Sequence, residues 1–283
     1  MRVVYCAVAL SFAISVTGES AVAAPIADRF GINIVQWDGL FTPNRPDPYS
    51  EFTTATAASN TFSPNSDIQA IANFATGEVG SRVKDQQTTD TNSRAAVFDT
   101  IRFDTGVSGS ARVSFDWSYK ATLSATSSFQ TPLAASSAII YDITGLSMWL
   151  QTQDFFGAEF VTPIFDQVTQ VARIDIDLEL QNSQKNGNLF PFDVTLSESF
   201  LADSSREYGI AIISQVGATG LTDMVDALNT GAFRFTDLDG ATVEYGSGVF
   251  LSDVADLPEP KSIALFATGL VGLGLMSRRR RRI

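Results

Sequence analysis

Three acidic residues alternate with apolar ones in one segment of the chain, and their carboxylates could do chemistry. They are Asp175, Asp177 and Glu179. On an extended strand, neighbouring members would point to one face about 6.5 to 7 Å apart, a spacing that suits a glycosidase acid and base pair or a calcium site. The intervening residues are all Ile or Leu, so a solvent-exposed strand face opposite a buried one explains the same pattern. We favour this second interpretation.

A second acidic pair, Asp237 and Asp239, precedes Gly240 and is similar to half of a calcium loop. In the register of an EF-hand loop, Phe235 would occupy the first ligand position and Gly246 the last, and neither side chain can bind calcium. Asp-Gly is also typical of a type I′ turn, so we prefer a hairpin turn here. We therefore expect no cofactor and no metal site, with calcium bound to an acidic surface as the weaker alternative.

Aromatic side chains could form a platform on which sugar rings stack, as in carbohydrate-binding modules. Trp117 and Tyr119 share the apolar face of one predicted strand, so we expect them in the core. Trp37 precedes Asp38-Gly39 in a predicted loop and is the best candidate for an exposed ring. The aromatic residues weighed for this role are Trp37, Trp117, Trp149, Tyr49, Tyr119 and Tyr141.

The composition of the 283-residue chain excludes several classes of catalyst. It contains no His and a single Cys, which excludes Ser-His-Asp and Cys-His catalytic units, imidazole-based zinc or copper sites and disulfides within the chain. A net charge of −12 argues against a nucleic-acid partner. We expect a protein that is not an enzyme. The alternative is a glycoside hydrolase or polysaccharide lyase that works through paired carboxylates.

The elements that must position these residues are mainly strands, because hydrophobic residues recur with a period of two. Two hairpins are predicted, over 171–198 and over 233–245. Two short helices are predicted, over 67–75 and around 221–228. Further strands are expected at 98–103, 113–119, 138–143, 146–150, 208–213 and 248–251. Together these elements predict a single antiparallel β-sandwich, jelly-roll-like, over residues 24–253.

The N-terminal residues 1–23 have the pattern of a secretory signal peptide. Arg2 precedes an apolar run of about 14 residues, which as a helix would span only about 21 Å and would be short for a bilayer. Ala21 and Ala23 fit the small-x-small cleavage rule, so cleavage after Ala23 is expected. Export through the general secretory machinery would follow, and cleavage would remove Cys6, the lone thiol.

The C-terminal end carries a second apolar run, 262–276, which we predict to be a transmembrane helix. Basic residues remain on the cytoplasmic side of a membrane, so the tail 277–283 is expected inside and the preceding linker 254–261 outside. The arginines that set this topology are Arg278, Arg279, Arg280, Arg281 and Arg282.

The C-terminal end contains Pro258-Glu259-Pro260, then a predicted glycine-rich apolar helix, then an arginine cluster. This order of elements resembles the PEP-CTERM protein-sorting signal of Gram-negative, exopolysaccharide-producing bacteria. The resemblance implies transient anchoring in the inner membrane with the main domain in the periplasm. It implies processing near Pro258, Glu259 and Pro260 by an exosortase, a membrane cysteine transpeptidase-like enzyme, and delivery to the cell surface or exopolysaccharide matrix. It covers only residues 257–283, departs from the usual pattern at Lys261, and implies nothing about the domain between the two signals.

Removal of both predicted signals changes the charge of the protein more than its size. The remaining domain keeps 29 of the 31 acidic residues and 12 of the 19 basic residues, a net charge of −17. Such a surface favours solubility and could bind divalent cations. The activity of this domain is open at this stage. The alternatives are a carbohydrate- or calcium-binding module and the carboxylate-dependent hydrolase or lyase acting on matrix polysaccharide.

Overall fold

The computed structural model describes the part of the chain that supplies the predicted sandwich. The described residues are 24–26, 29–37, 48–62, 67–84, 91–106, 109–126, 132–155, 158–218 and 224–251. The predicted signal peptide, linker, transmembrane helix and arginine tail lie outside them. Within the described ranges, no helix has the length and apolar character needed to cross a membrane.

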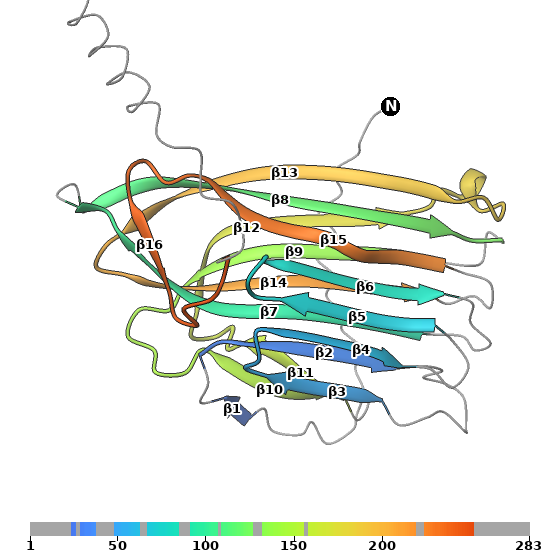
Figure 1. The fold of residues 1–283 in the computed structure, drawn as a ribbon, viewed down its shortest axis with the longest axis horizontal. Coiled ribbons are helices and arrows are strands. Elements are labelled where there is room, and N and C mark those ends of the chain that lie inside the picture. The colour runs from blue at the N-terminus through green and yellow to red at the C-terminus, as the bar shows by residue number, and fades with distance from the viewer. Residues whose placement is uncertain are drawn as a thin grey trace, which may run out of the picture.

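The described strands form three antiparallel sheets (Figure 1). The six-stranded sheet has the order β13-β8-β15-β6-β5-β4 and lies in front of the seven-stranded sheet, which has the order β12-β9-β14-β7-β2-β3 with β16 also paired to β7. A three-stranded sheet has the order β1-β10-β11. The prediction of a mainly β, antiparallel, sandwich-like fold is therefore confirmed.

The bounds of the six-stranded sheet are β4 (Ala57–Phe62), β5 (Asp67–Asn73), β6 (Glu78–Lys84), β8 (Ser110–Ser124), β13 (Phe190–Asp203) and β15 (Met224–Asp237). Those of the seven-stranded sheet are β2 (Gly31–Trp37), β3 (Tyr49–Thr53), β7 (Thr91–Asp104), β9 (Leu133–Asp142), β12 (Thr169–Glu179), β14 (Glu207–Ala218) and β16 (Thr242–Tyr245). The three-stranded sheet consists of β1 (Ala24–Ile26), β10 (Leu150–Phe155) and β11 (Ala158–Pro163).

The main core lies between the two large sheets. Strands of both sheets contribute every second side chain to it, as period-two alternation requires. Buried polar contacts also join the sheets: the Trp117 indole N–H donates to Ser136 Oγ at 3.0 Å, and the Tyr119 hydroxyl lies 3.3 Å from Ser214 Oγ. Because these polar groups are buried, each needs its partner, so the contacts favour one register between the sheets.

The three-stranded sheet covers part of the outer face of the seven-stranded sheet and creates a second core. Phe98, Tyr141 and Trp149 belong to it. As a result, the central strands β2 and β7 are buried on both faces over much of their length. Both strands therefore lack a regular alternation of buried and exposed residues, and they bury polar residues such as Asn33 and Arg94, so a sequence pattern does not show which way they face.

Arg94 ties this third layer to the seven-stranded sheet. Its guanidinium is buried, donates to Asn33 Oδ1 at 2.6 Å and to the Val161 carbonyl at 3.1 Å, and lies 5.4 Å from the centre of the Phe160 ring. Asn33 Oδ1 also accepts the Val161 N–H at 3.1 Å. Burial lowers the pKa of Arg94 to about 10, which leaves it charged at neutral pH.

The predicted hairpin over 171–198 is wrong. Strand β12 pairs with β9 in the seven-stranded sheet, whereas β13 pairs with β8 in the six-stranded sheet. The alternating apolar faces of the two strands meet across the sandwich instead of lying side by side. Alternation reports which face is buried, and it does not report which sheet the strand joins.

The predicted hairpin over 233–245 is also wrong, although its turn has the expected geometry. Asp239 and Gly240 both have positive φ, 49° and 79°, and the Ala241 N–H donates to the Leu238 carbonyl at 2.9 Å. The strands on either side then separate, with β15 paired to β8 and β6, and β16 paired to β7 of the other sheet.

Both predicted helices are strands. Residues 67–73 form β5, in which Ile68, Ala70 and Ala72 alternate with more exposed residues. Of the segment predicted as a helix around 221–228, residues 224–228 lie in β15 and residues 221–223 lie outside the described residues. Tertiary pairing overrides the local helical spacing of 224–228. The described residues contain no α-helix, only short 3₁₀ turns such as η2 (Asn182–Gln184).

Most of the separately predicted strands are confirmed and two are wrong. Segments 98–103, 113–119 and 208–213 lie within β7, β8 and β14, and 138–143 lies in β9 except for its last residue. By contrast, only Leu150 of the segment 146–150 is in a strand, and 248–251 forms turns.

Candidate functional site

The acidic triplet of Asp175, Asp177 and Glu179 lies on the exposed face of β12, at the edge of the seven-stranded sheet. Arg173 forms an ion pair with Asp175, and Ser137 Oγ donates to Asp175 Oδ1 at 2.7 Å. Burial, followed by the charges of Asp175 and Glu179, raises the pKa of Asp177. The three carboxylates line no described cavity, which agrees with the solvent-exposed strand face that we favoured.

The acidic pair at the second turn braces the backbone. Asp237 Oδ1 accepts the Asp239 N–H at 2.9 Å, and Asp239 Oδ2 accepts the Arg112 N–H at 3.2 Å. Among the described residues, no three or more His, Cys, Asp or Glu side chains are arranged to hold a metal ion.

The aromatic residues weighed as a sugar platform do not form one. Trp117, Tyr119, Trp149 and Tyr141 are buried as parts of the two cores, and Tyr49 is partly buried with its hydroxyl donating to Glu51.

Trp37, the best candidate for an exposed ring, is buried, and it lies at the end of β2 rather than in a loop. Its side chain is only 7% exposed, and its ring centre lies 5.6 Å from that of Phe160 in β11. The three-stranded sheet, which the sequence did not reveal, places Phe160 over Trp37 at the end of β2.

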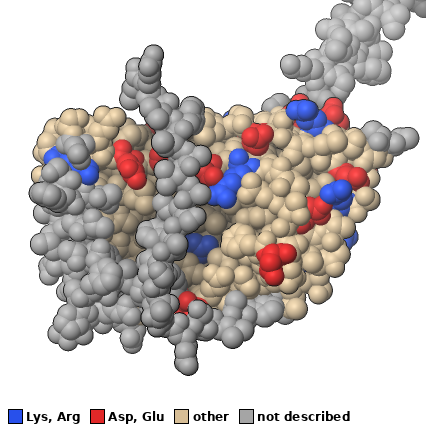
Figure 2. Space-filling view, turned by 180° about the vertical axis from the view of Figure 1, so that it is seen from behind, with Lys and Arg blue, Asp and Glu red and all other residues tan. Residues whose placement is uncertain are grey.

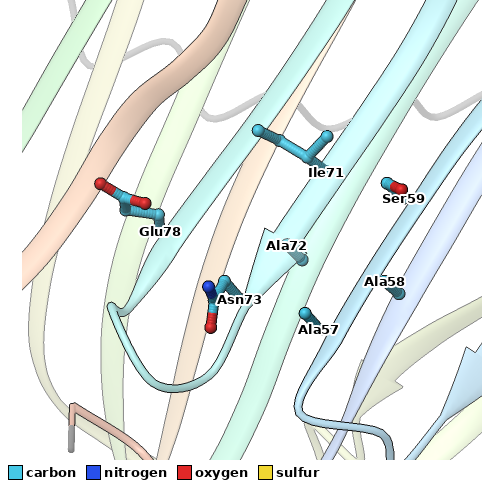
Figure 3. Close-up of a pocket in the computed structure, with 7 residues that line it drawn as sticks. All are labelled: Ala57, Ala58, Ser59, Ile71, Ala72, Asn73 and Glu78. Atoms are coloured by element: carbon cyan, nitrogen blue, oxygen red, sulfur yellow. The ribbon is translucent and has the colours of Figure 1, made fainter. Parts of the chain in front are cut away.

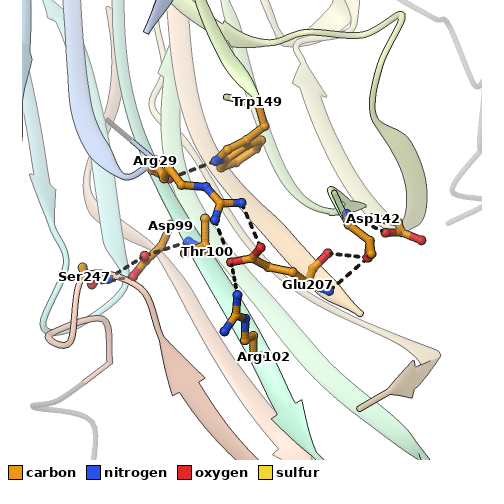
Figure 4. A network of polar contacts seen from close by, with 9 residues as sticks. Arg29, Asp99, Thr100, Arg102, Asp142, Trp149, Glu207 and Ser247 are labelled. Carbon is orange, nitrogen blue, oxygen red and sulfur yellow. Dashed lines mark hydrogen bonds and ion pairs between the residues drawn. The ribbon is translucent and has the colours of Figure 1, made fainter. Parts of the chain in front are cut away.

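A charged cleft of about 400 Å³ lies where β7, β14 and β16 meet the segment that leads into β2. Figure 4 shows the polar contacts around it. It is lined by Arg29, Phe30, Thr100, Ile101, Arg102, Glu207, Glu244, Tyr245 and Gly246.

The middle of the charged cleft is a row of three charges held in strand register. Arg102 in β7 lies opposite Glu207 in β14 on one side and opposite Glu244 in β16 on the other. The Glu207 carboxylate accepts two hydrogen bonds from Arg29, at 2.9 and 3.0 Å, and lies 3.4 Å from Arg102 Nη2. Arg29 therefore holds Glu207 in a bidentate pair. The Arg102 side chain is 64% exposed.

Trp149 fixes the Arg29 side of the charged cleft. Its indole N–H donates to the Arg29 carbonyl at 2.9 Å, and its ring packs directly over Gly209 of β14. A Cβ atom at Gly209 would lie 2.7 Å from the ring, so only glycine allows this approach. The backbone of Glu207 is fixed in turn, because its N–H donates to Thr144 Oγ1 at 3.1 Å.

Asp99 fixes the opposite side. Its carboxylate is fully buried and accepts the Thr100 N–H at 2.7 Å, the Ser247 N–H at 3.0 Å and the Ser247 hydroxyl at 2.5 Å. Burial raises the pKa of Asp99 to about 6, although these hydrogen bonds act in the opposite direction. The Gly246 N–H donates to the Thr100 carbonyl at 2.7 Å, so the turn after β16 is held against β7.

Two carboxylates in or beside the charged cleft are already engaged by neighbouring groups. Asp99, the carboxyl with the most perturbed pKa near the cleft, is sealed beneath the turn. Glu207 is held by Arg29 through both of its oxygens. The charged groups that the cleft exposes are therefore the donors of Arg102 and the acceptors of Glu244.

A smaller cavity of about 260 Å³ lies along the edge strand β4 and its neighbour β5 (Figure 3). Glu78 is the only charged side chain among the described residues that line it. The other residues are Ala57, Ala58, Ser59, Ile71, Ala72 and Asn73. With few convergent polar groups, it is the weaker candidate.

Sequence patterns missed the charged cleft because its charges come from four separate segments. Arg29 and Glu244 are far apart in the chain, and neither belongs to a motif. One signal was present: Asp99 stands between Phe98 and Thr100 in a strand whose odd-numbered positions face the main core. A carboxylate at such a position indicates a specific buried partner.

Comparison with known proteins finds no matching family model and no matching curated protein. Among solved structures, a particle of infectious bursal disease virus (IBDV) aligns with 12% identity over 89% of this chain and 66% of that chain, with a TM-score of 0.11. A mutant VP2 protein of the same virus aligns with 12% identity over 91% of this chain and 68% of that chain, with a TM-score of 0.10. Similarity this low carries no argument about fold or function.

Proposed function

We propose that this protein is an exported cell-surface or exopolysaccharide-matrix protein. A C-terminal sorting signal of the PEP-CTERM type holds it transiently in the inner membrane, with the main domain in the periplasm, until an exosortase processes it. The observation that carries this proposal is the order of the three tail elements, Pro258-Glu259-Pro260, the apolar run 262–276 and the arginines 278–282, at the end opposite a predicted signal peptide.

The position of the strands supports the same proposal. The first described strand begins at Ala24, directly after the expected cleavage point, and the last ends at Tyr245, before the predicted linker. Removal of the two signals would therefore take away none of the described strands. The mature domain would contain neither thiol nor imidazole, and we propose that it acts without catalysis.

Replacement of Glu259 by Ala tests the sorting signal. In a host that carries an exosortase, we expect the unchanged protein to be released from the inner membrane and the E259A variant to accumulate there at its full length. Fractionation of cells followed by immunoblotting would measure this. The matched control is D177A, which removes an exposed carboxylate from β12 and should be released normally. Equal release of the unchanged protein and E259A would contradict the proposal.

A further inference from the structure

The charged cleft carries a balanced set of charges within an acidic domain. Arg29 and Arg102 face Glu207 and Glu244, so the four side chains sum to zero, whereas the domain as a whole is at −17. Figure 2 shows acidic and basic side chains interspersed on the described part of one face, without a patch of a single sign. Neither a strongly anionic nor a strongly cationic ligand matches such a cleft, because each would meet two like charges.

The geometry of the row suits a ligand that both donates and accepts hydrogen bonds. Arg102 and Glu244 are directly opposed in paired strands, so their Cβ atoms are about 4.5 to 5.5 Å apart. Guanidinium offers only donors and carboxylate only acceptors. Two neighbouring hydroxyl groups on one ring can accept from the first and donate to the second. A neutral molecule with vicinal hydroxyls satisfies both partners without adding charge.

The walls of the charged cleft are fixed before any ligand arrives. Arg29 is held by Glu207 and by the indole of Trp149, and the turn after β16 is held by Asp99 through Ser247. A site that is already ordered loses little conformational entropy on binding. Its volume of about 400 Å³ lies in the lower part of the range of ligand pockets, and has room for roughly one or two sugar rings.

We propose that the charged cleft is a saccharide-binding site for a neutral sugar with vicinal hydroxyl groups. Arg102 donates to these hydroxyls, Glu244 accepts from them, and Glu207 positions Arg102. Polar contacts rather than stacking on tryptophan provide the binding, since Trp37, Trp117 and Trp149 are buried. Only described residues carry this proposal, so it does not rest on the proposed route of export.

The test is binding of the full-length chain, purified in a detergent without a sugar head group, to an array of neutral and acidic glycans. The strongest neutral glycan is then titrated by isothermal calorimetry into the unchanged protein, R102A, E244Q and R112A. We expect R102A and E244Q each to weaken binding about tenfold or more, as loss of a charge-assisted hydrogen bond does. R112A is the matched control, because Arg112 is an exposed arginine of β8 that contacts Ser199 outside the cleft.

Arg102 is largely exposed, so R102A should keep the melting temperature of the unchanged protein within a few degrees, which separates loss of binding from loss of fold. Three results would overturn the proposal. They are an array with no neutral glycan bound, binding restricted to acidic glycans, and neutral binding that R102A and E244Q leave unchanged.

Discussion

At the residue scale, Asp99 shows how one buried carboxylate organises the end of the sandwich. It comes from the middle of β7 and accepts three hydrogen bonds, two of them from Ser247, 148 positions later in the chain. The turn that follows β16 is thereby attached to the central strand, and Phe250 packs beside it in the main core. Burial removes water from around the Asp99 carboxylate. This disfavours the charged form and raises the pKa of the group.

Asp99 predicts a measurable pH dependence of stability. Its pKa is about 6 in the folded protein against an ordinary value of 3.8, so the folded state binds the proton more tightly. This contribution to the free energy of unfolding is fully present below pH 3.8, falls as the pH rises to about 6, and is then lost. The difference of about two units corresponds to about 3 kcal/mol.

Urea unfolding measured from pH 3 to pH 8 checks this, with D99N as the test variant. Asparagine has nearly the same shape and cannot ionise, so the decline between pH 4 and pH 6 should largely disappear. E159Q is the control, because Glu159 is exposed and should leave the decline in place. A decline of the same size in D99N would show that another group causes it.

At the element scale, alternation predicted which residues of a strand are buried but not which strand it pairs with. The even-numbered residues of 174–180 and 190–196 face the main core as expected, yet their strands belong to opposite sheets. The turn residues also predicted only part of the structure. Asp239-Gly240 forms the expected turn, but the strand before it and the strand after it belong to different sheets. Pairing is decided by contacts distant in sequence, which a local pattern does not contain.

The acidic triplet on β12 has a structural explanation at this scale. Strand β12 ends the described seven-stranded sheet, and an edge strand exposes backbone groups that can pair with another chain. Charges on such an edge oppose pairing with a second copy. Asp175, Asp177 and Glu179 place three like charges along this edge.

Replacement of all three with Thr should therefore promote self-association with little loss of stability. Sedimentation velocity over a range of concentrations would detect dimers or larger species. The control removes the same charge from exposed turns and ends of other strands, by D104N, E159Q and D166N. If the triplet variant and the control are equally monomeric, the acids do not protect this edge.

At the scale of the whole molecule, three layers explain both what was predicted and what was missed. The sandwich follows from strand patterns. The third layer covers Trp37 and Arg94, and it arises because β10 and β11 pack on the outer face of the seven-stranded sheet. The charged cleft lies beyond this cover, and its charges come together only when all the strands are in place. A site of this kind has no signature in any one segment.

The folded domain is distinct from the proposed sorting signals. Every described strand lies between the two predicted signals, so the domain and its proposed route of export can be tested separately. Loss of saccharide binding in R102A should leave processing unchanged, and E259A should leave saccharide binding unchanged.

We propose that the chain is exported, anchored and then cut at its C-terminal tail. Intact-mass analysis of the protein released by an exosortase-bearing host tests it most directly. We predict a species that begins at Ala24 and has lost the apolar run 262–276 together with the arginines 278–282. A released protein that still carries residues 262–283 would contradict the account.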